Sequence, residues 1–205
     1  MNLENLQRLP EKRTFQSMVS VREFLIICGG SDFEASRGYN DLWSYNTISG
    51  VWKRYELPIE VKNTFYPMTC AVGNLVYIFG AEVFENDFYH INSLFSFDVT
   101  HGTWTNVYYR SDGDENTIEK IKFSIIFYHD GFLYVMGTGE EDSNLNLIYK
   151  FCLETLTWTL VQQLGEIPVF YDTFYGTVFK NQYCLKKIDC VFSIAFKVQH
   201  PDLVK

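Results

Sequence analysis

The residue types that most often carry out chemistry are few in this 205-residue sequence, and they do not cluster. No two histidines stand at the spacing of a metal-binding pair, and there is no Gly-x-Ser-x-Gly elbow, Walker loop or dinucleotide-binding fingerprint. The five cysteines form no Cys-x-x-Cys pair, and several fall in apolar runs where a thiol is an ordinary core side chain. These residues are His90, His101, His129 and His200, and Cys28, Cys70, Cys152, Cys184 and Cys190. The sequence therefore predicts no catalytic residue, no metal site and no cofactor.

The bulk composition is that of a folded, acidic protein. Apolar residues make up 47% of the sequence and aromatic residues 18%, which argues against disorder. The net charge of −8 provides no basic face for nucleic acid. No apolar run approaches the roughly 20 residues of a membrane helix, and the polar N-terminus does not resemble a signal peptide. The odd cysteine count and the lack of an Asn-x-Ser/Thr acceptor favour a reducing compartment, so we expect a cytoplasmic or nuclear protein without nucleic-acid or membrane partners.

One segment occurs three times with the same pattern, which makes the sequence an internal repeat. The copies are NDLWSYNTISGVW from Asn40, SLFSFDVTHGTW from Ser93 and LIYKFCLETLTW from Leu147, and the stride is a little over fifty residues. In each copy an aromatic residue stands seven positions before a tryptophan. The pairs are Tyr45 and Trp52, Phe97 and Trp104, and Phe151 and Trp158. We expect the three tryptophans to pack at equivalent places between neighbouring repeats.

Two further segments precede each copy in the same order. The nearer one is an alternating apolar run that ends in glycine, as in EFLIICGG, NLVYIFG and GFLYVMG, and the glycines are Gly29, Gly30, Gly80 and Gly137. The farther one is represented by TFQSMVS from Thr14, TFYPMTC from Thr64, IKFSIIF from Ile121 and TFYGTVF from Thr173. Repeats of this length built from short strands are typical of a β-propeller, in which each repeat is one four-stranded blade.

The sequence therefore predicts an all-β fold, a partial propeller with three full four-stranded blades and an incomplete fourth. We expect residues 1–205 to form a single propeller domain. The fourth copy has neither a glycine pair nor a tryptophan-bearing last strand. The expected blades span about 14–57, 64–109, 121–163 and 173–198.

The repeats resemble those of the kelch family. The kelch repeat has a Pro-x-x-Arg-x-x-His-Ser lead, an apolar strand ending in Gly-Gly and an aromatic seven residues before a Trp. PEKRTFQS, from Pro10 to Ser17, matches the lead except that Gln16 replaces the His. Kelch propellers usually have six blades, so the resemblance implies that about two are missing, as in a fragment, a truncated product or a decayed copy. An unclosed sheet would expose edge strands, and we expect such a chain to be sticky or marginally stable.

The segment from Pro168 to Val204 resembles the last blade and exit of a subgroup typified by kelch domain-containing protein 10. That resemblance implies a substrate receptor of a cullin-2 ubiquitin ligase that grips short C-terminal degrons. A helical box after the propeller docks elongin in that subgroup, and this sequence stops roughly where such a box would start. The alternative is a protein-interaction scaffold with a cytoskeletal or small-GTPase partner and no ligase link. A hydrolase or oxidase is a poorer third hypothesis.

Binding residues are expected at one mouth of the propeller, where the glycine-ended strands feed loops at Ser31–Tyr39, Ala81–Asn92 and Gly139–Asn144. The kelch resemblance places four residues near this mouth, in the connections that enter the blades: Arg13, Asn63, Lys120 and Asp172. If the pocket reads a peptide carboxylate, Arg13 and Lys120 are the expected cations, because a charge-assisted hydrogen bond contributes about 1.5–3 kcal/mol. Alternatively, Arg13 ties adjacent blades together.

The long segment Ala81–Asn92 raises a second open question. It carries Phe84, Phe88 and Tyr89 among acidic residues. These aromatic side chains either form a contact surface for a partner or pack onto their own blade, and the sequence favours neither arrangement.

Overall fold

The computed structural model divides the chain into two compact units, Met1–Thr117 and Ile118–Lys205. Both units consist of strands, turns and loops in the residues that the structure describes. Within these residues no helix is long and apolar enough to span a bilayer. The described residues are 8–32, 34–35, 37–58, 67–80, 82–85, 87–90, 93–109, 118–119, 121–139, 146–163, 174–179, 182–187 and 194–197.

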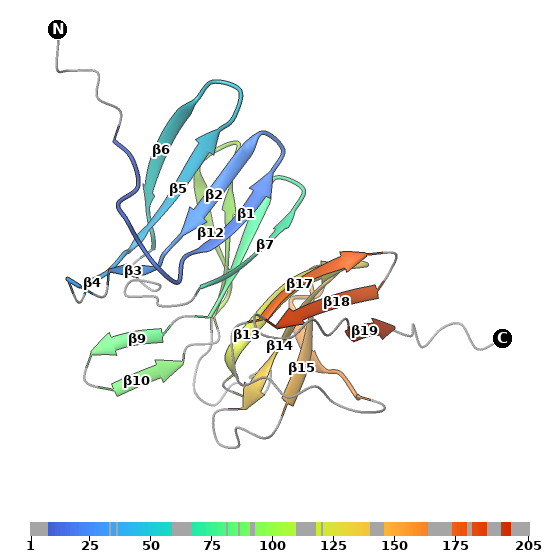
Figure 1. The fold of residues 1–205 in the computed structure, drawn as a ribbon. Helices are drawn as coiled ribbons and strands as arrows, with labels where there is room; N and C mark the ends of the chain where they lie inside the picture. The colour runs from blue at the N-terminus through green and yellow to red at the C-terminus, as the bar shows by residue number, and fades with distance from the viewer. Residues whose placement is uncertain are drawn as a thin grey trace, which may run out of the picture. The chain divides into compact units, whose positions relative to one another are not determined.

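The first unit begins with a four-stranded antiparallel sheet in the order β1-β2-β5-β6 (Figure 1). Its strands are β1 (Ser17–Val21), β2 (Phe24–Cys28), β5 (Asp41–Asn46) and β6 (Val51–Glu56). A small hairpin of β3 (Ser31–Asp32) and β4 (Arg37–Gly38) lies in the connection from β2 to β5. The sequence predicted only a polar loop there, because strands of two residues leave no alternating pattern.

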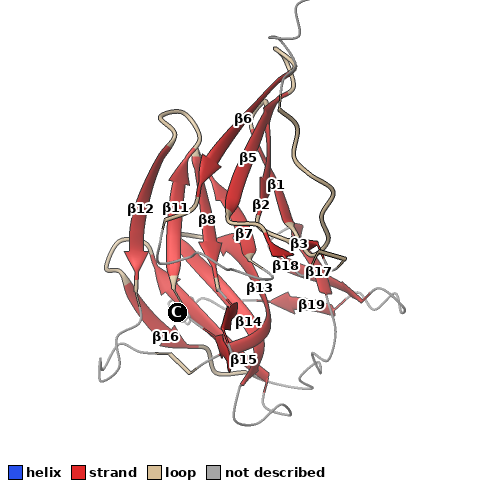
Figure 2. Cartoon of the chain, turned by 90° about the vertical axis from the view of Figure 1, so that its left-hand side faces the viewer, coloured by secondary structure: helices blue, strands red, loops and turns tan. Residues whose placement is uncertain are grey.

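The second sheet of this unit repeats the plan, and Figure 2 shows β12, β11, β8 and β7 side by side. Its strands are β7 (Met68–Val72), β8 (Leu75–Phe79), β11 (Leu94–Asp98) and β12 (Thr103–Tyr108). The segment predicted as a long loop contains a second hairpin, β9 (Glu82–Glu85) with β10 (Asp87–His90). The side chains of Phe84, Phe88 and Tyr89 lie outside the described part, so both arrangements proposed for them stay predictions.

The two sheets of the first unit share one hydrophobic core. Ile26 and Leu42 of the first sheet and Val76 and Phe95 of the second belong to the same buried cluster. At the level of β1 and β7, the hydroxyl oxygens of Ser17 and Thr69 lie 2.7 Å apart. A thin sheet cannot bury its apolar residues alone, and each fully buried Leu or Phe contributes about 1.5–3 kcal/mol. Packing of sheet against sheet therefore supplies the stability that single blades lack.

The second unit contains a four-stranded sheet in the order β13-β14-β15-β16 and a three-stranded sheet in the order β17-β18-β19. The core of the four-stranded sheet includes Phe127, Tyr134 and Met136. The strands of the four-stranded sheet, the third of the chain, are β13 (Ile121–His129), β14 (Phe132–Gly139), β15 (Asn146–Cys152) and β16 (Thr157–Leu160). The strands of the three-stranded sheet are β17 (Phe174–Phe179), β18 (Gln182–Lys187) and β19 (Ile194–Lys197).

This architecture confirms the predicted fold class, an all-β partial propeller with three four-stranded sheets and an incomplete fourth. Burial follows the order of strands within a sheet. The first four residues of β5 and of β11 are all buried, whereas β6 and β12 place mostly exposed residues between half-buried ones. In these two sheets the third strand is therefore covered on both faces, and the last strand carries most of the exposed residues.

The repeated aromatic and tryptophan residues stand directly opposite each other on paired strands. Tyr45 pairs with Trp52, Phe97 with Trp104 and Phe151 with Trp158 in the strand registers. The ring centroids are 4.8 Å apart in all three pairs. A spacing of seven residues joins two strands through a tight turn so that the two rings face the same side, where cross-strand aromatic pairs stabilise a sheet.

Candidate functional site

The candidate site lies at the end of the first sheet where β2 finishes in Gly29 and Gly30. We call this the glycine end of a sheet, and we call the opposite end, where β1 turns into β2 and β5 into β6, the turn end. Of the four residues predicted to contact a ligand, Arg13 is described, and Asn63, Lys120 and Asp172 lie outside the described residues. The structure therefore places Arg13 and its neighbours.

The Arg13 side chain is almost fully buried, with 4% of its surface exposed. Its Nη1 donates to the Asp41 carboxylate at 2.6 Å and to the Gly29 carbonyl at 3.0 Å. Its Nη2 donates to the Glu11 carboxylate at 3.2 Å, and its Nε to the Glu11 carbonyl. These partners all belong to the first sheet and the segment that enters it. In the structure, Arg13 therefore fastens the entering segment to its own sheet. A role of Arg13 in ligand binding stays a prediction.

Asp41, the first residue of β5, is the centre of the cluster. Its carboxylate is fully buried, and the oxygen that does not bind Arg13 accepts hydrogen bonds from Arg54 Nε at 2.9 Å and Trp43 Nε1 at 3.0 Å. Burial on its own would raise the pKa of Asp41, but the hydrogen bonds from Arg13 and Arg54, the charge of Arg13 and the bond from Trp43 together lower this pKa. Asp41 is therefore ionised and saturated with donors.

A buried cysteine lies beside this charged pair. Burial raises the pKa of Cys28 to about 12; the Asp41 charge adds to the rise and the Arg13 charge opposes it. Cys28 is a free thiol with no exposed surface. A protonated, enclosed thiol is a poor nucleophile, so Cys28 serves as a core side chain.

An aromatic ring covers the cluster and carries a second cation on it. The Arg13 guanidinium lies 4.1 Å from the centroid of the buried Tyr39 ring, and the Arg37 guanidinium lies 5.3 Å from it. The Tyr39 hydroxyl donates to the Lys12 carbonyl at 3.2 Å. Arg37 is exposed in β4, and no hydrogen bond or ion pair engages its guanidinium within the described part of the chain. Arg37 is thus a cation at the glycine end that can still accept an anionic group.

Gly30 is required at this end because the entering segment passes directly over it. Thr14 and Ser31 exchange two backbone hydrogen bonds of 2.9 and 2.8 Å. A Cβ on Gly30 would stand 2.8 Å from the Thr14 carbonyl oxygen, and the φ of Gly30 is +96°. Gly29 (φ +61°) and Gly80 (φ +80°) also have positive φ, whereas Gly137 lies inside β14. Only glycine fits both the space and the backbone conformation at Gly30.

Sequence reasoning missed Asp41, Arg54, Tyr39 and Arg37. Asp41 precedes the repeated apolar-aromatic pair, but Ser93 and Leu147 stand at the corresponding positions of the other repeats, so the repeat itself gave no signal. The arginines come from a predicted loop and an outer strand, where charged residues are ordinary. Within the described residues no group of three or more His, Cys, Asp or Glu side chains could hold a metal ion. The arrangement can bind an anion or a polar peptide.

Comparison with known families is consistent with this geometry. Residues 2–185 match a family model described as the KLHDC2/KLHL20/DRC7 Kelch-repeats domain. This chain belongs to the kelch-repeat family. The predicted kelch resemblance is therefore confirmed, and the lead Pro10-x-x-Arg13 acquires a physical meaning: its arginine anchors the segment entering a kelch blade. Kelch-repeat domains are generally non-enzymatic and bind other proteins, which identifies this chain as a protein-binding module.

Proposed function

We propose that this kelch module recognises a short peptide at its glycine end and acts as the substrate-recognition subunit, or part of one, of a cullin-RING ubiquitin ligase. Membership of the kelch family carries the proposal, because kelch domains are generally protein-interaction domains. The resemblance of the segment from Pro168 to the subgroup of kelch domain-containing protein 10 supports the ligase role. Elongin and cullin-2 would be partners of a longer product that carries a C-terminal box.

Electrostatics support a ligand that carries a carboxylate. Arg37 is exposed and has no ionic partner among the described residues, while the ring of Tyr39 beneath it orders its guanidinium. Arg13 forms ion pairs with Asp41 and Glu11, so we propose that it contributes positive electrostatic potential and keeps the neighbouring residues in place. The further proposed contacts are Asn63, Lys120 and Asp172, while Arg13 is proposed to act on the ligand through its charge.

We also propose that residues 1–205 form one propeller, with blades over about 14–57, 64–109, 121–163 and 173–198. The recurrence of one strand plan in successive sheets supports this arrangement. The compartment proposed for the protein is the cytoplasm or the nucleus, because the odd cysteine count and the lack of an Asn-x-Ser/Thr acceptor favour a reducing compartment.

The peptide proposal is tested by fluorescence anisotropy with the full chain. The probe is a fluorescein-labelled decapeptide that ends in glycine with a free carboxylate, and its control is the same peptide with an amidated end. We expect the amide to bind at least tenfold more weakly, and the Arg37→Gln and Lys120→Ala variants to lose a similar factor, because each removes a charge-assisted hydrogen bond. Lys150→Gln, in strand β15 (Asn146–Cys152) and outside both proposed sites, is the matched control and should bind normally. Equal binding of the two peptides would refute carboxylate recognition.

The ligase role needs a separate experiment. Affinity purification of the complete gene product from cells should recover elongin and cullin-2 in stoichiometric amounts. Recovery of a cytoskeletal protein or a small GTPase without elongin would instead favour the scaffold hypothesis, and it would contradict the ligase role while leaving the binding module intact.

A further inference from the structure

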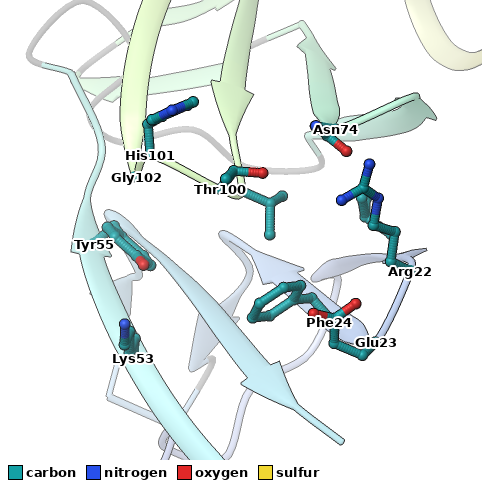
Figure 3. Close-up of a pocket in the computed structure, with 11 residues that line it drawn as sticks. Arg22, Glu23, Phe24, Lys53, Tyr55, Asn74, Thr100, His101 and Gly102 are labelled. Atoms are coloured by element: carbon teal, nitrogen blue, oxygen red, sulfur yellow. The ribbon is translucent and has the colours of Figure 1, made fainter.

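A second potential binding site lies at the turn end of the first unit, away from the glycine end. A cavity of about 320 Å³ opens between the two sheets of this unit. Its walls come from the β1–β2 turn, strand β6, the β7–β8 turn and the β11–β12 turn (Figure 3). Six of the side chains that line the cavity carry the argument: Arg22, Glu23, Phe24, Lys53, Tyr55 and His101. The size is within the range of pockets that hold small ligands or a few peptide side chains, about 300–1,000 Å³.

Two cations line this cavity without a partner. Arg22 and Lys53 are exposed, and their side chains make no hydrogen bond or ion pair within the part of the chain that the structure describes. In Figure 3 they stand on opposite sides of the cavity. The chain as a whole carries a net charge of −8, whereas the charged residues that line this cavity are two cations and one carboxylate. Their arrangement favours an anionic ligand.

The floor between the cations is aromatic and fixed. Tyr55 packs edge-on against Phe97 at a centroid distance of 4.7 Å, and Phe24 packs against the core cluster of the unit. Gly102 leaves room for the Tyr55 ring, since a Cβ at this glycine would stand 2.9 Å from the Tyr55 Cε1 atom. Both rings are half-buried, which leaves part of each available to an apolar group. The floor is therefore preformed for an aromatic or aliphatic side chain.

Two further side chains at the cavity limit which anion fits. The Glu23 carboxylate also lines the cavity, so the formal charge of Arg22, Lys53 and Glu23 together is +1. A dianionic phosphate would be repelled by Glu23, whereas single carboxylates can reach the cations on the two sides. His101 is held by Asp98, whose carboxylate lies 2.9 Å from His101 Nδ1, so this imidazole forms part of the wall.

We propose that this cavity binds an acidic peptide segment of a protein partner, in which carboxylate side chains flank an aromatic residue. The aromatic side chain rests on Phe24 and Tyr55, and the carboxylates pair with Arg22 and Lys53. This site would let the module contact a second protein while the glycine end holds its peptide.

The probe for this proposal is Glu-Phe-Glu-amide with fluorescein on its N-terminal amine, titrated with the full chain and followed by anisotropy. Gln-Phe-Gln-amide with the same label is the control without carboxylate side chains, and inorganic phosphate is the competitor. The test variant is Arg22→Asn combined with Lys53→Gln. Arg22 has a φ of +51°, a conformation that asparagine tolerates, so this variant should fold; circular dichroism checks that it does. Lys12→Gln, an exposed cation of the entering segment, is the matched control.

We expect the acidic peptide to bind at least tenfold more tightly than the control peptide, and the double variant to lose that advantage while Lys12→Gln keeps it. Amide chemical shifts of the turn residues Arg22, Asn74 and Gly102 should move in a ¹⁵N NMR titration of the same complex. Equal binding of the two peptides, unchanged binding by the folded double variant, or displacement by millimolar phosphate would each overturn the proposal.

Discussion

The glycine ends of the first and second sheets have the same backbone hydrogen bond but different buried side chains. In both sheets the glycine that follows the second strand donates to a carbonyl at the start of the third strand: Gly29 to Asp41, the first residue of β5, at 3.0 Å, and Gly80 to Ser93, just before β11, at 3.2 Å. The Asp41 side chain is saturated with donors. The Ser93 hydroxyl is buried, with no hydrogen-bond partner among the described residues. Both sheets thus have the same backbone hydrogen bond at the glycine end. Of the two, only the first sheet has a cluster of charged side chains there.

The largest effect is expected from neutralising the centre of that cluster. Asp41→Asn leaves the buried Arg13 guanidinium without its counter-charge and should lower the free energy of unfolding by about 3 kcal/mol. Ser93→Ala, at the matching position, should change it by less than about 1 kcal/mol, since this hydroxyl has no described partner to lose. Urea denaturation of both variants measures the difference. Similar losses would mean that the two glycine ends depend on the same interaction.

Protonation of Asp41 is the milder version of this change. The folded state lowers the pKa of Asp41 below its ordinary value of 3.8, so the unfolded chain takes up this proton first as pH falls. The contribution of Asp41 is present above pH 3.8 and is lost as pH falls from there through the lower folded pKa. We expect the acid limb of the stability curve to be flatter in Asp41→Asn than in the wild type. Parallel acid limbs in urea titrations from pH 6 to pH 3 would contradict this.

Two glycines with positive φ, Gly30 at the glycine end of the first sheet and Gly80 at that of the second, provide the next comparison. Gly30→Ala should lower the free energy of unfolding by about 2 kcal/mol, because its Cβ would press on the Thr14 carbonyl and its φ of +96° is unfavourable for alanine. Gly80→Ala should cost only about 1 kcal/mol, because φ is +80° but no described atom lies within 4 Å of the new Cβ. Thermal unfolding reports both. An equal loss would place the cost in the backbone conformation and not in the contact with Thr14.

The smallest effect is expected in the third sheet, at its turn end. Leu156 has a φ of +56° where the first two sheets have Gly50 and Gly102, and half of its surface is exposed. Leu156→Gly should therefore raise the free energy of unfolding, by about 1 kcal/mol. The matched change in the opposite direction, Gly50→Ala, should lower it by a similar amount, since the nearest atom to its new Cβ is 4.0 Å away. A loss of stability in Leu156→Gly would show that its side-chain contacts outweigh the backbone strain.

Local sequence patterns predicted most of the fold, because the same strand and turn patterns recur in each repeat. Alternating runs gave the strands, and the seven-residue spacing of Phe97 and Trp104 gave a cross-strand pair. The hairpins β3–β4 and β9–β10 were missed because strands of two to four residues carry too little periodicity.

The candidate site was less predictable, because it joins residues that are distant in sequence. Arg13 and Asp41 are 28 positions apart, and their pairing depends on the path of the entering segment over Gly30. An arginine in a polar lead would ordinarily be assigned to the surface, and its burial follows only from the fold.

The three matched aromatic pairs also provide intrinsic fluorescent probes of the separate sheets. The chain has four tryptophans, and Trp52, Trp104 and Trp158 each sit against one ring of their own sheet at the same 4.8 Å. Variants in which one of these three indoles is the only tryptophan left, with Trp43 also replaced by phenylalanine, would give an emission signal assigned to a single blade. Melting curves from such a set would reveal whether the array comes apart in one cooperative step or sheet by sheet, without any external label.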